Sequence, residues 1–163
     1  MDMLAALALS IGVLIAIWTY IAVSVAALPV WVGIITWGAF FAAGGKTDGL
    51  VKTIAASLSG LVWAFIAITL SSKLGGGTAI LAVLVGAIAF AMVMQSKVSL
   101  LSFIPGAFLG AAATVGAGAT TDPESLGKIA IALVAGAVFG YVSETLAGAM
   151  AKKSAPSEAT GRA

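Results

Sequence analysis

Long apolar stretches alternate with short glycine-rich or polar runs along most of this chain. A helix needs about 20 apolar residues to cross about 30 Å of hydrocarbon. The polar breaks, at residues 44–49, 73–77 and 120–124, contain the glycine, proline and aspartate that are typical of loops. The pattern predicts six membrane-spanning helices, over Leu4–Leu28, Pro29–Ala43, Leu50–Leu70, Thr78–Gln95, Val98–Ala117 and Leu126–Met150.

The last of these helices carries a clear start signal. Asp122 stands at the N-cap position, Pro123 takes the first helical position and Glu124 lies in the first turn. This order of residues is typical of a helix N-terminus.

Parts of the first half of the chain recur in the second half. Residues 36–43 return at 104–111, and Lys52–Phe65 returns at Lys128–Tyr141, with Gly60 matched to Gly136. A unit with three spans must insert in opposite orientations when it is duplicated. The sequence therefore predicts two inverted three-helix repeats, at about 4–72 and 78–150, with a solute site at their interface. The first helices of the two halves do not align convincingly.

Two predicted spans differ from ordinary membrane helices. Pro29–Ala43 is only about 15 residues, or about 22 Å at 1.5 Å per residue, which is short for the hydrocarbon core. Val98–Ala117 contains Pro105 and Gly106 in its middle, where proline is expected to kink the helix. Short or interrupted spans at matching positions in two halves point to a transport site.

Composition decides the class of protein. The 163 residues are 61% hydrophobic and 9% charged, against about 25% charged in soluble domains. We expect an all-α integral membrane protein with one domain over residues 1–150 and a disordered cytoplasmic tail over 151–163. The net charge of +2 is better explained by membrane orientation than by nucleic-acid binding.

Candidate chemistry is sparse. The chain has no Cys and no His, which removes thiolate metal sites and the commonest general base. Gly75-Gly76-Gly77 is not followed by the Lys-Ser/Thr of a phosphate loop. We therefore expect no enzyme activity, no metal and no cofactor.

The distribution of basic residues predicts the orientation in the membrane. In the six-span topology, one side holds six basic residues and the other holds two. Basic residues favour the cytoplasmic side, so both termini are expected there. The six are Lys46, Lys52, Lys97, Lys152, Lys153 and Arg162, and the two are Lys73 and Lys128.

The candidate solute path lies at the two unusual spans. Phe40 and Phe108, each preceded by Gly-Ala, are candidates for a constriction that filters small neutral solutes by size. The alternative for these phenylalanines, and for Trp37, is ordinary helix packing. The full set of candidate path residues is Thr36, Trp37, Gly38, Phe40, Ser99, Ser102, Pro105, Gly106 and Phe108.

Glu144 is the only acid inside a predicted span. An ionisable group within the membrane indicates a functional site by default, so Glu144 is a candidate for ion or proton coupling. The alternative is that it reaches the headgroup region and pairs with Lys152 or Lys153.

Small residues recur at intervals of four along several spans, a spacing that lets helices approach closely. The glycines concerned are Gly60, Gly110, Gly136 and Gly140. The contact can lie within the chain or between subunits, and we expect a homo-oligomer in the lipid bilayer.

The segment Leu100–Thr114, LLSFIPGAFLGAAAT, is the most recognisable stretch of the chain, and Leu58–Ala64 and Phe139–Tyr141 add to it. These motifs resemble a bacterial inner-membrane family known as domain of unknown function 1097, the YcdZ-like proteins. The resemblance implies a multi-pass protein of the inner, cytoplasmic membrane. It brings no substrate and no functional residues.

Three functions fit these observations. The first is a channel or facilitator for a small, mostly uncharged solute of unknown identity. The second is an ion-coupled secondary transporter, and the third is a non-transporting structural or partner subunit.

Overall fold

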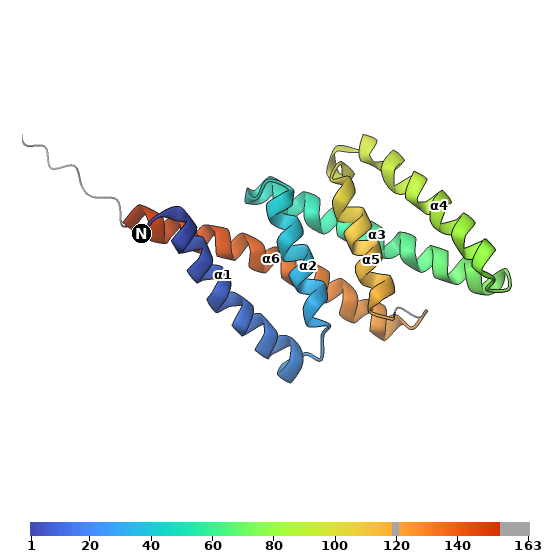
Figure 1. The fold of residues 1–163 in the computed structure, drawn as a ribbon, viewed down its shortest axis with the longest axis horizontal. Coiled ribbons are helices and arrows are strands. Elements are labelled where there is room, and N and C mark those ends of the chain that lie inside the picture. The colour runs from blue at the N-terminus through green and yellow to red at the C-terminus, as the bar shows by residue number, and fades with distance from the viewer. Residues whose placement is uncertain (119–120, 154–163) are drawn as a thin grey trace, which may run out of the picture.

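The computed structural model describes residues 1–118 and 121–153. The part of the chain that it describes is all-helical and forms six α-helices (Figure 1). Residues 154–163, which include Arg162 and most of the predicted tail, lie outside this part, as does Thr120 of the last predicted loop. The helices are α1 (Met3–Tyr20), α2 (Val30–Ala42), α3 (Lys46–Lys73), α4 (Thr78–Met94), α5 (Ile104–Gly116) and α6 (Pro123–Lys153).

Four helical segments are long and apolar enough to cross a membrane: Met3–Val25, Lys46–Lys73, Thr78–Lys97 and Pro123–Ala151. The first extends α1 by a π-helical turn, and the third extends α4 by a 3₁₀ turn. Helices α2 and α5 have 13 residues each, or about 20 Å at 1.5 Å per residue. The expected shortness of the second apolar segment is confirmed, whereas the full six-span topology stays a prediction.

The prediction for Pro105 was wrong in one respect. The proline does not kink a 20-residue helix, because α5 begins at Ile104 and Pro105 lies in its first turn. The preceding Ser99–Leu101 forms a separate 3₁₀ turn. Proline lacks an N–H group, and the first helical turn is the place where that group has no partner in any case.

The start of α6 agrees with its sequence signal. The Asp122 carboxylate accepts a hydrogen bond from the Ser125 amide at 2.8 Å. This bond lowers the pKa of Asp122 from its ordinary value. Glu124, in the first turn of α6, forms an ion pair with Lys128 at 2.7 Å. Helix α3 begins with the same kind of ion pair, between Asp48 and Lys52 at 2.7 Å.

The two short helices pack against the two longest ones. Helix α2 lies mainly on α6 and α5 mainly on α3, while α1 packs on α6 and α4 on α3. Figure 1 shows that α2 and α5 run in opposite directions, as do α3 and α6. Each long helix therefore supports the short helix from the other half of the chain.

Glycines let these helices cross at backbone distance. A methyl group added to Gly136 would collide with the Gly33 carbonyl oxygen and the Thr36 hydroxyl. Likewise, a methyl group on Gly60 would collide with the Ala107 carbonyl oxygen, and one on Gly110 would collide with the Ser57 carbonyl oxygen. Gly140 lies against the ring of Phe40, which is buried on α2. The crossings are therefore main-chain contacts with no room for side chains.

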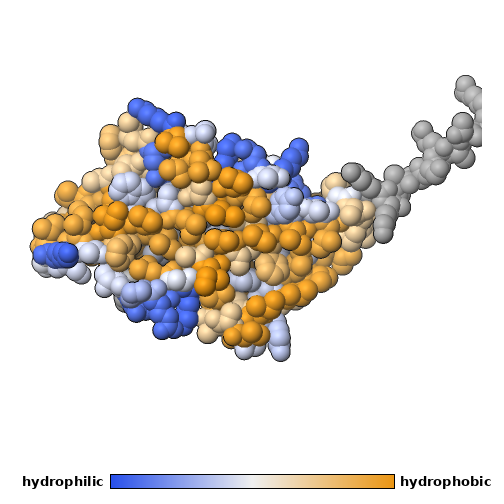
Figure 2. All heavy atoms as spheres, turned by 180° about the vertical axis from the view of Figure 1, so that it is seen from behind, coloured by the Kyte–Doolittle hydropathy of each residue, from blue (hydrophilic) through white to orange (hydrophobic). Residues whose placement is uncertain are grey.

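Much of the outer surface is apolar. Figure 2 shows a broad hydrophobic band over the face seen from behind, with hydrophilic residues gathered in patches at its margins. Helix α4 is the extreme case, since Ile88 and Met92 are its only buried residues. Such a surface suits lipid or a neighbouring membrane helix and not water.

We expect Gly136→Ala to destabilise the protein by about 1–3 kcal/mol, because overpacking forces backbone shifts at the crossing of α6 with α2. The measurement is the thermal unfolding midpoint of the detergent-purified protein, followed by far-UV circular dichroism. Gly127→Ala, at an open position of the same helix, is the matched control. It should leave the midpoint unchanged or raise it, because alanine favours helix. Equal midpoints for the two variants would contradict the tight crossing.

Candidate functional site

The residues that the sequence proposed for a solute path fall into two different environments. Four are buried where the short helices meet the long ones: Thr36, Trp37, Phe40 and Gly106. Five are exposed on the outer surface: Gly38, Ser99, Ser102, Pro105 and Phe108. The structure therefore does not bring the whole set together along one enclosed path.

The helix ends align the two halves of the chain differently from the sequence match, which paired residues 36–43 with 104–111. Val30 corresponds to Ile104 as the first residue of a 13-residue helix, and Gly44 corresponds to Gly118 after its end, with φ angles of 96° and 70°. The matching Gly-Ala-Phe strings instead lie in the second half of α2 and in the first half of α5. Short apolar strings recur easily by chance, whereas proline and positive-φ glycine mark the ends of helices.

Phe40 and Phe108 accordingly have different surroundings. The Phe40 side chain is fully buried, and its ring lies 5.1 Å from that of Phe41 and 6.4 Å from that of Tyr141. Phe108 is 40% exposed on α5. Phe40 thus occupies the interior between α2 and α6, and Phe108 faces outward.

The interior between the short and long helices is mostly apolar, and the polar groups within it are uncharged. The buried polar residues of the described chain are all serines and threonines. The Thr36 hydroxyl lies 3.2 Å from the Gly33 carbonyl oxygen, and the Thr114 hydroxyl donates to the Gly110 carbonyl at 2.7 Å. Hydroxyl groups in helices commonly bond to a carbonyl one turn back.

Thr53 is the exception to this rule. Its hydroxyl is fully buried and has no hydrogen-bond partner in the described structure. It lies on the buried stripe of α3 between Gly49 and Ala56. Gly49 approaches the carbonyl oxygens of Phe40 and Ala43 at the end of α2, and Ala56 lies against Gly106 at the start of α5. Thr53 is therefore placed between the end of α2 and the start of α5.

Sequence reasoning missed Thr53. The available signal was its spacing, because Gly49, Thr53 and Ser57 are four residues apart and share one face of a helix. That face is the one that α3 turns toward the short helices.

Trp37 belongs to a hydrogen-bonded cluster that joins three helices. Its indole N–H donates to the Ser143 hydroxyl at 3.1 Å, and that hydroxyl donates to the Gly140 carbonyl at 2.7 Å. Ser10 of α1 donates to the Ser143 carbonyl at 2.9 Å. This network gives Trp37 a structural role and ties α1 and α2 to α6.

A second cluster joins α3 to the end of α4. The Trp63 indole donates to the Gln95 side-chain oxygen at 2.9 Å, and the Gln95 amide nitrogen donates to the Ser59 hydroxyl at 2.9 Å. Each outer helix is therefore anchored to the long helix of the other half: α1 to α6 through Ser143, and the end of α4 to α3 through Trp63.

Glu144 has a defined structural partner. Its carboxylate accepts a hydrogen bond from the backbone N–H of Lys46 at 2.7 Å. Lys46 is the first residue of α3, so a side chain of α6 caps α3. An anion suits this position because the first amides of a helix lack partners. The side chains of Lys152 and Lys153, the partners that the sequence suggested, lie outside the described part.

Comparison with known proteins gives a family and no function. A family model described as "Protein of unknown function (DUF1097)" matches residues 8–148. The inner membrane protein YcdZ of Escherichia coli K12 is 40% identical over 143 residues, covering 86% of this chain and 83% of that protein. YcdZ of Salmonella typhimurium LT2 is 38% identical over 142 residues, covering 86% and 85%.

A third relative is the uncharacterized protein YahC of Escherichia coli K12. It is 30% identical over 154 residues, which cover 88% of this chain and 90% of that protein. No solved structure matches the chain.

We expect Glu144→Ala to loosen the start of α3, because the Lys46 amide loses its acceptor at a cost of about 1 kcal/mol. Glu144→Gln should preserve most of the stability, since its side-chain oxygen can accept the same bond. Hydrogen exchange of the amides of residues 46–49 measures the effect directly. Faster exchange in both variants, or in neither, would contradict a capping role.

Proposed function

This chain belongs to the DUF1097 family, and we propose that it lets a small, mostly uncharged solute cross the inner membrane. The path runs along the contact of α2 and α5 with α3 and α6. The protein acts as a multi-pass channel or facilitator without enzymatic activity and without a cofactor.

The helix contacts of the first half correspond to those of the second half, which supports an inverted repeat. When α1, α2 and α3 are replaced by α4, α5 and α6, the contact of α2 with α6 becomes the contact of α5 with α3. The contact of α1 with α6 likewise becomes that of α4 with α3. The ion pairs Asp48–Lys52 and Glu124–Lys128 also correspond. Repeats of this kind place solute sites at their interface.

The single observation that carries the proposal is the Thr53 hydroxyl. Five other helical threonines donate to a carbonyl three or four residues back: Thr19, Thr36, Thr69, Thr114 and Thr145. Thr53 is as deeply buried as Thr36 and has no such bond. An unsatisfied buried polar group costs about 1–3 kcal/mol. A hydroxyl kept at that cost between the two short helices is suited to bind a passing solute.

The chemistry of the interior favours an uncharged solute. The buried polar side-chain groups of the described residues are hydroxyls and the indole N–H groups of Trp18 and Trp37, which form hydrogen bonds but carry no charge. An ion placed among them would lack a counter-charge, and burying an unpaired charge is far more costly than burying a polar group. In this proposal the solute passes when α2 or α5 moves across its glycine contact.

The remaining features of the proposal concern orientation and assembly. We place both termini in the cytoplasm, because the basic residues of the six-span topology are concentrated on their side. We also propose a homo-oligomer that uses the apolar surface of α4, whose buried residues are only Ile88 and Met92.

The same observation on α4 supports the second candidate function. A helix that is held to its own chain mainly along α3 can also be the docking surface of a different membrane protein. In that case the chain is a non-transporting partner subunit. An ion-coupled transporter has less support, because Glu144 already caps α3.

The test is stopped-flow permeability of proteoliposomes that contain the purified protein, with water, urea, acetamide and glycerol. We expect permeability above that of empty vesicles for at least one solute. Thr53→Val should reduce it several-fold, because valine keeps the shape of threonine and removes the hydroxyl. Phe40→Ala should raise it by opening the interior.

Two matched variants serve as controls. Thr19→Val removes a hydroxyl from an exposed position, and Phe108→Ala removes an exposed ring. Both should leave the permeability unchanged. If no solute crosses faster than through empty vesicles, the channel proposal fails. Recovery of a stable hetero-complex from native membranes would then favour the partner subunit.

A further inference from the structure

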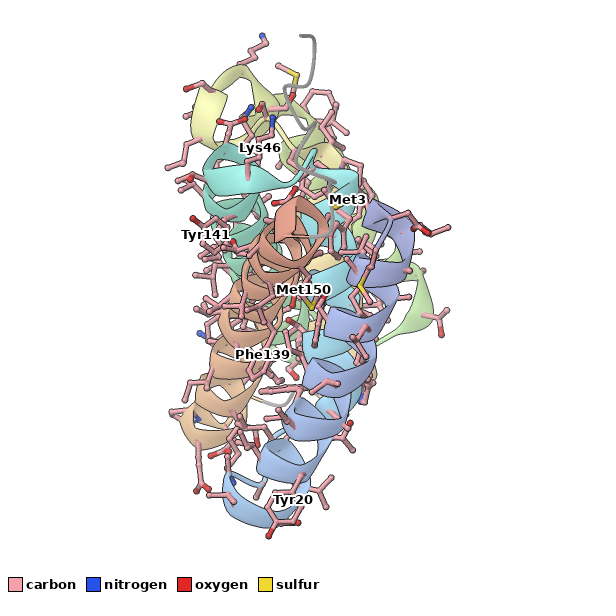
Figure 3. All side chains as sticks on the ribbon, turned by 90° about the vertical axis from the view of Figure 1, so that its left-hand side faces the viewer. Met3, Tyr20, Lys46, Phe139, Tyr141 and Met150 are labelled. Atoms are coloured by element: carbon pink, nitrogen blue, oxygen red, sulfur yellow. The ribbon has the colours of Figure 1, made fainter. Side chains whose placement is uncertain are left out.

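A hollow of about 490 Å³ lies where α1 and α3 begin and α6 nears its end. Figure 3 shows Met3, Lys46 and Tyr141 near one another in the upper half of the view and Tyr20 at the bottom. Residues from α1, α2, α3 and α6 line the hollow, among them Met3, Leu7, Phe41, Lys46, Tyr141 and Glu144. Neither Thr53 nor Phe40, on which the proposed solute path depends, lines this hollow.

The hollow presents charges of both signs. Glu144 is bound through one carboxylate oxygen to the backbone N–H of Lys46, at 2.7 Å. Lys46 lines the same hollow, and its ammonium group takes part in neither of the two ion pairs found in the described chain. A cation is thus available beside a carboxylate that is already positioned by the main chain.

The backbone holds this arrangement in a strained conformation. Gly45 and Lys46 both have positive φ angles, of 67° and 58°. Positive φ is uncommon for a residue such as lysine, and strain of this kind is concentrated at functional sites. The bend sets the start of α3 against α6, where the Lys46 N–H is bound by Glu144.

The walls of the hollow are mostly apolar. Met3 and Leu7 of α1, Phe41 of α2 and Ala147 of α6 form these walls, and Tyr141 adds an aromatic ring with a hydroxyl. The hollow lies at the ends of apolar helices that are long enough to span a membrane. In the membrane arrangement that we propose, this is the level at which lipid headgroups meet the hydrocarbon.

We propose that the hollow binds a zwitterionic phospholipid whose headgroup carries a phosphate and a primary ammonium. The phosphate lies toward Lys46, and the ammonium lies toward the free carboxylate oxygen of Glu144. The apolar walls hold the start of the acyl chains. An anionic lipid is disfavoured, because its phosphate can pair with Lys46 but its headgroup has no ammonium to pair with the Glu144 carboxylate.

The experiment uses the full-length protein, purified in detergent and titrated with phosphatidylethanolamine or phosphatidylglycerol of the same acyl chains. Native mass spectrometry counts the lipids retained. We expect phosphatidylethanolamine to be retained several-fold more than phosphatidylglycerol. Lys46→Gln and Glu144→Gln should each reduce this retention several-fold.

Two variants keep the test specific. Lys73→Gln removes an exposed lysine from the far end of α3 and should change nothing. Lys46→Arg keeps the cation and should restore binding, which separates loss of charge from loss of fold. A thermal unfolding curve for each variant checks that it is folded.

Three results would overturn the proposal. One is equal or stronger retention of phosphatidylglycerol. Another is retention of phosphatidylethanolamine that Lys46→Gln and Glu144→Gln leave unchanged. The third is displacement of the lipid by soluble glycerophosphoethanolamine at the same concentration, which would assign the hollow to a water-soluble zwitterion.

Discussion

The contact of each short helix with the long helix of the other half is the constraint on which the remaining structure depends. Lipid offers no hydrogen-bond partners, so irregular backbone at membrane depth must be covered by protein. Helices α2 and α5 are too short to reach both surfaces by themselves. Gly136 and Gly60 let the long helices approach them to main-chain distance. One face of each short helix is thereby covered by a long helix.

Polar side chains add further ties at the periphery. The Trp37–Ser143 bond holds α2 to α6, and Ser10 adds α1 to the same point. On the other side, Trp63 and Gln95 hold the end of α4 to α3. Since indole and amide groups cannot be left unpaired in hydrocarbon without cost, these bonds also fix how the outer helices are placed. Along the rest of its length α4 is largely exposed, with Ile88 and Met92 as its only buried residues.

Sequence patterns were sufficient for features that depend on composition and spacing. The apolar stretches gave the helices, and the Asp122–Pro123 signal gave the start of α6. They were insufficient where a tertiary contact decides the outcome. The Gly-Ala-Phe match placed Phe40 and Phe108 in equivalent positions, yet one is buried and the other exposed. Similarly, no local pattern shows that Glu144 caps a helix almost 100 residues earlier in the chain.

The separation of charge from the interior is the last consequence of the same packing. Crossings at backbone distance leave space for hydroxyls but not for long charged side chains with their partners. Charged groups of the described chain are accordingly excluded from the buried set, and Glu144 is satisfied by a helix terminus. In the channel that we propose, a solute entering between α2 and α5 would meet hydrogen-bonding groups without a counter-charge, among them the Thr53 hydroxyl, which has no partner in the described structure. Because an ion would have to leave its hydration shell for this environment, such a path would favour uncharged solutes.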